Sequence, residues 1–543
     1  MTTIDTRPDS GTSLGTDTPA GRAVSAVVSW ITTADHKRIG RSFVAISLLF
    51  LVGMTVIGSL LGFERLQPDG IALDADSIDQ LFSLFRVGSA FFVLAPLLLG
   101  IALAVVPLQL GARSLALPRA ASLGLWTWVA GGVIVVVAYV NNGGPGGGEE
   151  NMVDLFLMGL ALACIGLVLA AGSIVVSVLT TRAPGMTIAR VPLFSWSALV
   201  GGVAVVLTLP VLVGDLILLT VDHRYGRTAF GGNTGITTWM GWALTQPATY
   251  VYAVPALGIA AEIIATATHR RPPMRGAVLL GIGIFATATL AAVTQRTHDL
   301  PWGGDSFFGD FGDKFNDLLP YALFNLLPIL GVLIVLGVGG LALKSSRPTV
   351  SAPLVFALLG LLMLLTGVLA HALTPIVDLQ LADTVYEEGV FVYVAYGAIL
   401  TAFGAVAHWG PKLWGRRIAD KQAIPLALLG FLATILASLP LLLAGFQGQP
   451  AGAPGGYDYD LAPELLNALV FAGHALMLIT VVAFSLLALR SFATGEPAGD
   501  DPWNGQTLEW ATSSPPPPDN FSDVRTVASA TPVLDLQPAR SDA

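Results

Sequence analysis

Long apolar stretches, separated by short polar segments, make up most of this chain. A helix that crosses a bilayer needs roughly 20 mostly apolar residues. Twelve stretches satisfy that requirement, at about residues 42–62, 87–109, 121–141, 153–179, 195–220, 239–268, 276–294, 319–343, 352–373, 385–408, 424–446 and 464–489. Only structures that bond their own backbone groups cross lipid, so runs of this length are typical of helices. The pattern predicts an all-α integral membrane protein with twelve transmembrane helices.

The placement of basic residues predicts how these helices are oriented. Lys and Arg are enriched in the cytoplasmic loops of membrane proteins. If the N-terminus is cytoplasmic, every inner segment carries positive charge, at Lys37, Arg38, Arg41, Arg113, Arg119, Arg182, Arg190, Arg270, Arg271, Arg275, Lys344, Arg347, Lys412, Arg416, Arg417 and Lys421. The outer loops are acidic instead, as between residues 74 and 79. Both termini are therefore expected in the cytoplasm.

Composition agrees with a membrane domain flanked by polar tails. The 543 residues are 54% hydrophobic and 12% charged, whereas soluble domains carry roughly 25% charged residues. We predict a disordered cytoplasmic tail at 1–27, a membrane domain at 28–495 and a Pro-rich cytoplasmic tail at 496–543. The one cysteine, Cys164, lies in an apolar run and is expected to be a small core residue. No nucleic-acid signature is present.

Five segments, in order along the chain, resemble parts of subunit I of the heme–copper oxidases, and in particular of the A-type cytochrome c oxidases. They are Trp30-Ile-Thr-Thr-Ala-Asp-His-Lys-Arg-Ile-Gly40, Pro107-Leu-Gln-Leu-Gly-Ala-Arg-Ser-Leu-Ala-Leu-Pro-Arg119, Arg182-Ala-Pro-Gly-Met186, Pro411-Lys-Leu-Trp-Gly-Arg416 and Pro502-Trp-Asn-Gly-Gln-Thr-Leu-Glu-Trp-Ala-Thr-Ser-Ser-Pro515. The resemblance covers roughly residues 28–522. It implies the twelve-helix arrangement of that subunit, a bacterial-type inner membrane, contact with lipid, and partner membrane subunits like oxidase subunits II and III.

The resemblance also implies two hemes and a copper ion, held by six histidines, and this chain departs from that pattern. Matching the family motifs places Phe85, Val390 and Val392 at the heme-ligand positions and Gln246, Gln295 and Arg296 at the copper-ligand positions. Neutral imidazole suits iron and copper, and a valine or phenylalanine side chain has no lone pair to offer. We therefore expect no heme, no copper and no oxygen reduction by the family mechanism.

Supporting positions of the family chemistry are changed as well. The proton-relaying glutamate corresponds to Ala248, and the arginines that hold heme propionates correspond to Gly455 and Gly456. The aspartate at one proton-pathway entrance corresponds to Ser114, and the lysine of the other pathway corresponds to a position near Phe324. The histidine near the outer magnesium site corresponds to Gln380. Tyr250 is retained but has lost its histidine partner, so packing is its expected role.

Charged residues near the emptied heme positions form a candidate buried polar site, made of Arg86, Arg296, Glu387, Glu388 and Tyr250. Charges at membrane depth are rare and are usually functional. We hypothesise that Arg86 pairs with Glu388 where the low-spin heme of the family lies, and that Arg296 neutralises Glu387. A structural ion pair is the alternative to a substrate or proton site.

The remaining histidines are expected to be ordinary structural residues. No two of them are spaced like metal ligands on one helix. His474 lies in the middle of the last predicted span, which in the family faces away from the metals.

Three functions are compatible with the sequence. The first is a non-catalytic subunit or scaffold of a membrane complex. The second is a transporter or small-molecule-binding protein that uses the vacated heme cavities. The third is a terminal oxidase subunit whose cofactors have rearranged ligands.

Overall fold

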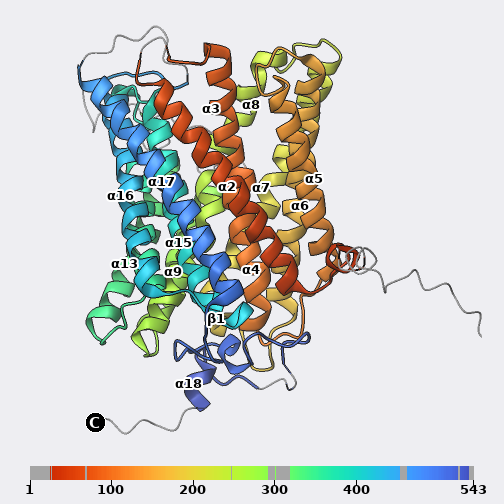
Figure 1. Cartoon of the computed structure of the whole chain (residues 1–543), viewed down its shortest axis with the longest axis vertical. Helices are drawn as coiled ribbons and strands as arrows, with labels where there is room; N and C mark the ends of the chain where they lie inside the picture. The colour runs from red at the N-terminus through yellow and green to blue at the C-terminus, as the bar shows by residue number, and fades with distance from the viewer. Residues whose placement is uncertain are drawn as a thin grey trace, which may run out of the picture.

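The computed structural model describes residue 25 and residues 27–67, 70–245, 248–290, 300, 318–452, 461–521, 523 and 526–536. These residues form a bundle of long helices (Figure 1). The C-terminal tail lies at one end of the bundle, which we call the tail side, and α3 lies at the opposite end, the loop side.

The α-helices of the bundle are α2 (His36–Glu64), α3 (Ala75–Val87), α4 (Ala95–Gln109), α5 (Pro118–Val140), α6 (Glu150–Thr180), α7 (Leu193–Arg224), α8 (Gly232–Thr245), α9 (Ala248–Thr268), α10 (Arg275–Phe285), α13 (Leu327–Lys344), α14 (Ala352–His371), α15 (Val385–Trp414), α16 (Asp420–Phe446) and α17 (Leu461–Thr494). Shorter elements are η1 (Gly88–Leu94), η2 (Ile188–Arg190), η3 (Ala322–Leu326), η4 (Val377–Leu379), η5 (Leu508–Ala511), α18 (Pro532–Leu536), and strands β1 (Arg416–Arg417) and β2 (Glu496–Pro497), which pair antiparallel.

The predicted all-α membrane fold is confirmed. Within the described ranges, eleven helices are long and apolar enough to span a bilayer. The twelfth predicted span, at about 276–294, coincides with a shorter apolar helix at Arg275–Leu290, and residues 291–299 lie outside the described part. The predicted span at 87–109 is longer than expected, because α3, the π-helical η1 and α4 run on as one segment from Ala75 to Gln109.

Small residues allow neighbouring helices to approach closely. A Cβ added at Gly131 of α5 would lie 2.5 Å from the backbone nitrogen of Ala163 on α6. One added at Gly166 of α6 would lie 2.5 Å from the backbone nitrogen of Trp128. Glycine at such crossings is common in membrane bundles, where association depends on van der Waals packing rather than on the hydrophobic effect.

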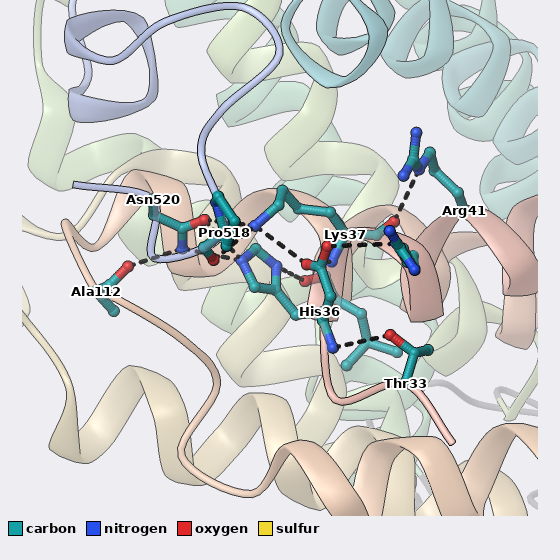
Figure 2. A network of polar contacts seen from close by, with 10 residues as sticks. Thr33, His36, Lys37, Arg41, Ala112, Pro518 and Asn520 are labelled. Atoms are coloured by element: carbon teal, nitrogen blue, oxygen red, sulfur yellow. Dashed lines mark hydrogen bonds and ion pairs between the residues drawn. The ribbon is translucent and has the colours of Figure 1, made fainter. Parts of the chain in front are cut away.

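The N-terminal motif and the C-terminal tail are joined on the tail side by a buried polar network (Figure 2). His36 Nδ1 lies 3.0 Å from the carbonyl oxygen of Leu103, which can only accept, so Nδ1 carries the proton. Nε2 of the neutral ring then accepts from Asn520 Nδ2 at 2.9 Å. The same amide donates to the carbonyl of Ala112, and its Oδ1 accepts from Lys37 Nζ at 2.9 Å. One tail asparagine therefore connects α2 with the loop after α4.

Removal of this amide tests how much the tail contributes to stability. Asn520→Leu leaves the buried Lys37 ammonium with only Asp35 and the carbonyl of Pro518. We expect the free energy of unfolding to fall by about 2–4 kcal/mol, because a buried donor is left partly unsatisfied. Thermal unfolding in detergent and limited proteolysis of the tail measure this loss. Ser513→Ala, a change at an exposed residue of the same tail, is the matched control and should behave as wild type.

A second tail contact buries a carboxylate. Glu509 of η5 is fully buried and its Oε1 accepts from Gln109 Nε2 at 3.0 Å and from Trp409 Nε1 at 3.3 Å. Its Oε2 has no hydrogen-bond partner within the described residues. Glu262 of α9 and Lys412 of α15 interact with it electrostatically. Desolvation by burial raises the pKa of the Glu509 carboxyl above its usual range.

This pKa shift predicts a pH-dependent attachment of the tail. A carboxyl whose pKa is higher in the folded than in the unfolded protein contributes most below its ordinary pKa, and it destabilises the fold as pH rises. Glu509→Gln keeps an acceptor for Gln109 and removes the charge. The variant should therefore be more stable than wild type, by a margin that widens as the pH rises above the ordinary pKa of a glutamate carboxyl. Thermal melts over this pH range measure the difference in stability between the variant and wild type. A difference that does not change with pH would contradict a raised pKa for Glu509.

Candidate functional site

The first low-spin heme-ligand position of the resemblance holds a tightly packed phenylalanine. Phe85, at the end of α3, is 2% exposed. Its ring meets Phe391 of α15 at a centroid distance of 6.1 Å and His474 of α17 at 5.8 Å, both edge to face. Three helices thus bring aromatic rings together where the resemblance places a heme ligand.

On the side that faces α2, this group of rings is tightly packed. A Cβ added at Gly58 of α2 would lie 2.9 Å from His474 Nδ1 and 3.1 Å from Phe85 Cε2. His474 Nδ1 is also 2.8 Å from the hydroxyl of Tyr396. The expectation that His474 faces away from the heme-ligand positions is wrong, because α17 packs against α2 and turns this residue inward.

The two other heme-ligand positions, on α15, are buried valines. Val392 is fully buried in the main core of the bundle. Val390 is 5% exposed and belongs to a separate apolar cluster with Tyr386, Tyr393 and Leu442. Residues two apart on a helix point in different directions, so the valines contribute to two packing regions.

Tyr250, the retained tyrosine, is buried in α9. Its ring packs edge to face on His371 of α14 at a centroid distance of 4.9 Å. The Tyr250 hydroxyl and His371 Nε2 have no hydrogen-bond partner within the described residues. The ring of Tyr250 is packed and its hydroxyl finds no partner in the described part of the chain, so the role of this residue stays a prediction.

The copper-ligand positions cannot be placed in the same way. Gln246, Gln295 and Arg296 lie outside the described residues, as do Gly455 and Gly456. The assignments at these positions, and the predicted pairing of Arg296 with Glu387, stay predictions. Within the described ranges, no group of three or more His, Cys, Asp or Glu side chains could hold a metal ion.

The supporting positions are distributed over the bundle. Ser114 is exposed in the loop after α4, Gln380 follows η4, and Phe324 lies in η3. Ala248 is the first residue of α9. The structure does not gather them into one site.

Glu388 has a different partner from the one predicted. Its Oε2 lies 2.7 Å from Arg65 Nη1, and the two side chains are 3% and 2% exposed. Arg65 also donates to the carbonyl of Gly452, at 3.2 Å. The predicted Arg86–Glu388 pair is therefore wrong. Arg65 follows α2 directly, so the end of that helix places its guanidinium beside the start of α15.

Arg86 lies near this ion pair but makes no direct hydrogen bond to Glu388 within the described residues. Its guanidinium lies 5.3 Å from the ring centre of Phe82 and interacts electrostatically with Glu387 and Glu388. Its Nε and Nη2 are buried without a hydrogen-bond partner within the described residues. Arg65 lies over the same ring, at 5.8 Å. Two arginines and two glutamates thus form a charged group around Phe82, and a third carboxylate, that of Asp383, also interacts with Glu387.

Sequence reasoning missed Arg65, although a signal for it exists. The residue lies just beyond the first predicted span, in a loop predicted to be on the outer side. The positive-inside rule leaves such loops poor in basic residues. An arginine that runs against this rule, next to an apolar span, indicates a buried or paired side chain.

Comparisons with known proteins decide the family. Residues 38–484 match the family model described as cytochrome C and quinol oxidase polypeptide I. A Streptomyces coelicolor protein described as a cytochrome c oxidase subunit 1-beta is 30% identical over 94% of this chain and 91% of its own length. The cytochrome c oxidase subunit 1 of Corynebacterium glutamicum is 28% identical over 99% of this chain and 94% of its own length.

The chain belongs to the cytochrome c and quinol oxidase polypeptide I family. The fold agrees, because a chain from the cryo-electron microscopy structure of a heme–copper terminal oxidase dimer superimposes with a TM-score of 0.66. That chain is 14% identical, and the match covers 85% of this chain and 84% of the other. This member of the family is a multi-pass membrane protein, and its bacterial relatives indicate a bacterial inner membrane.

The side chains that the resemblance places at the three heme-ligand positions do not fit iron ligation. Phe85, Val390 and Val392 carry no lone pair, and each is packed against neighbouring side chains. The nearby His474 is hydrogen-bonded through Nδ1 to Tyr396 and packed edge to face on Phe85. We derive no reaction step through a heme at this place.

The reassigned ion pair generates a test. Arg65→Leu leaves Glu388 buried without its direct partner, so we expect a loss of about 3–5 kcal/mol in unfolding free energy and a sharp fall in folded yield. Arg86→Leu should be milder, because Glu388 keeps Arg65. The double variant Arg65→Leu/Glu388→Leu should recover much of the loss, since removal of both charges leaves none unpaired.

Folded yield and melting temperature in detergent report all three variants. Equal losses for Arg65→Leu and Arg86→Leu contradict the assignment of Arg65 as the principal partner.

Proposed function

We propose that this protein is a non-catalytic member of its family, which keeps the oxidase subunit I fold without hemes or copper and serves as a subunit or scaffold of a membrane complex. Its partners would be membrane subunits like oxidase subunits II and III, with both termini in the cytoplasm. The packing around Phe85 is the observation that carries the proposal.

The aromatic packing argues against a porphyrin at the low-spin position. Protein interiors are close-packed, and added bulk forces neighbouring groups to move. The Phe85 ring contacts the rings of both Phe391 and His474, and a carbon added at Gly58 would lie within 3.1 Å of Phe85 and His474 atoms, so one of them would have to move. A heme at this place would have to displace rings that come from three helices.

The residue types at the copper positions support the same proposal through the resemblance. Gln246 and Gln295 offer only neutral amides in place of imidazole. Arg296 is protonated under all physiological conditions, so it has no lone pair for a cation and repels it. Reduction of oxygen by the family mechanism needs metals at these positions.

Retention of the N-terminal motif and the C-terminal tail has a structural explanation. The two segments bind each other through Asn520, His36 and Lys37 (Figure 2). These contacts are independent of the heme-ligand positions. The retained contacts stabilise the fold without any involvement of the heme-ligand positions, and a scaffold requires a stable fold.

A second candidate, binding or transport of a small molecule, is favoured by one observation. The guanidinium of Arg86 has buried nitrogen atoms without a partner within the described residues. An anionic group could satisfy them. The charged group around Phe82 already places Glu387 and Glu388 within electrostatic reach of Arg86, so the scaffold is the better-supported function.

An optical spectrum of the purified protein, oxidised and dithionite-reduced, with iron and copper analysis of the same sample, tests the proposal. We expect no Soret band and no stoichiometric metal. Cytochrome c oxidase subunit 1 of Corynebacterium glutamicum, purified in the same detergent, is the positive control. Heme with about one iron per chain would overturn the proposal and show that other ligands exist.

The scaffold part of the proposal has its own readout. After gentle detergent extraction, we expect the protein to migrate as a complex larger than one chain, with membrane subunits identified by mass spectrometry. A single chain under the mildest extraction would contradict a scaffold role while leaving the spectroscopic result intact.

A further inference from the structure

An apolar groove runs along the membrane-facing side of the bundle on the tail side. It lies between α2 and α17, which pack side by side (Figure 1), with α4 and α15 contributing to its walls. Its volume is about 750 Å³. Ligand pockets of this size are typically apolar, with a few polar groups that fix orientation. The groove is separate from the heme-ligand positions and from the charged group around Phe82.

Most of the groove wall is aliphatic or aromatic. Side chains such as Val52, Val105, Ala405 and Leu489 line it. Leu49, on the α2 wall, is 72% exposed. In a bilayer such a surface faces hydrocarbon, so the groove is open to acyl chains rather than to water.

Positive charge gathers at one end of the groove. Arg38 and Arg41 of α2 line that end. Arg38 is 53% exposed, and its nearest carboxylate, Asp35, lies 3.9 Å away and is already paired with Lys37 at 3.1 Å. Arg41 donates through Nε to the carbonyl of Lys37, and within the described residues no carboxylate lies within ion-pair distance of it. Within the described residues, one carboxylate, Asp35, thus serves three basic side chains, so positive charge is in excess at this end of the groove.

Aromatic and hydroxyl groups complete the site. Trp30 lines the same end and donates through Nε1 to Ser42 Oγ at 3.1 Å. Indole rings are enriched at the level of lipid headgroups. Further along α17, Ser485 lines the groove, and its Oγ is buried without a hydrogen-bond partner within the described residues. This hydroxyl suits an ester carbonyl or a glycerol hydroxyl.

We propose that this groove is a binding site for an anionic glycerophospholipid. Arg38 and Arg41 hold the phosphate, Ser485 bonds the glycerol-ester region, and the acyl chains lie along α2 and α17. The tail side is the predicted cytoplasmic side, and anionic lipid is concentrated in the cytoplasmic leaflet. The site is independent of the proposed function, because none of these residues lies at a heme- or copper-ligand position.

Charge complementarity selects an anionic lipid over a zwitterionic one. A basic residue near the membrane surface strengthens the binding of anionic lipid about five-fold. Two arginines together predict a preference of about 25-fold for phosphatidylglycerol over phosphatidylcholine, provided that their effects add.

Native mass spectrometry of the full chain, released from nanodiscs of equal phosphatidylglycerol and phosphatidylcholine content, tests this site. Wild type should retain phosphatidylglycerol preferentially, and Arg38→Gln/Arg41→Gln should lose most of the preference. The matched control is Arg113→Gln/Arg119→Gln, which removes the same charge from exposed positions outside the groove lining. It should keep the wild-type preference.

A second pair of variants tests the groove itself. Ala488→Phe places a ring in the groove and should reduce retention of both lipids. Ala130→Phe, at an exposed position of α5, is its control and should change nothing.

Equal retention of the two lipids by wild type would overturn the proposal, and so would equal losses in the two double-arginine variants. Unchanged lipid retention in Ala488→Phe would place the lipid elsewhere. Melting temperatures of all variants distinguish a loss of lipid from a loss of fold.

Discussion

Close packing of the bundle interior is the constraint on which this structure depends. Helices that resemble those of a heme-carrying subunit must fill the same interior with side chains if they hold no prosthetic group. Between α3, α15 and α17, Phe85 packs edge to face on Phe391 and His474, and the Tyr396 hydroxyl bonds Nδ1 of the buried imidazole. Val392 belongs to the same core as these aromatic rings, whereas Val390 packs in a separate cluster on another side of α15. The family fold thus persists with its helix crossings supported by ordinary apolar contacts.

Buried charges obey a second constraint, because a charge in a low-dielectric interior must be paired. On the loop side, Arg65 pairs with Glu388, and Arg86 interacts electrostatically with Glu387 and Glu388. Both arginines lie over the Phe82 ring. On the tail side, the buried charge is that of Lys37. Its ammonium is bound by the carboxylate of Asp35, the carbonyl of Pro518 and the amide oxygen of Asn520, so two segments far apart in sequence contribute. Both arrangements join the ends of helices to loops. They hold the bundle together at the levels where apolar packing gives way to polar surroundings.

The outer surface follows a third rule, since it must match lipid rather than water. Exposed leucines and valines cover the helices, and the groove between α2 and α17 adds a recess with arginines at one end. The arginines give this recess a specific chemistry that the surrounding apolar surface lacks. Lipid binding and partner binding are both compatible with a protein whose interior is closed.

Sequence alone determined the all-α membrane class, the positions of the spans and the family, because long apolar runs and local motifs act over neighbouring residues. It also identified Phe85, Val390 and Val392 as residues that cannot ligate iron. The partner of Glu388 required the tertiary structure, since Arg65 and Glu388 are 323 residues apart and only the approach of α2 to α15 brings them together. The inward position of His474 likewise depends on how α17 packs against α2. Local pattern decides which segments are helices, whereas packing between distant helices decides which side chains meet.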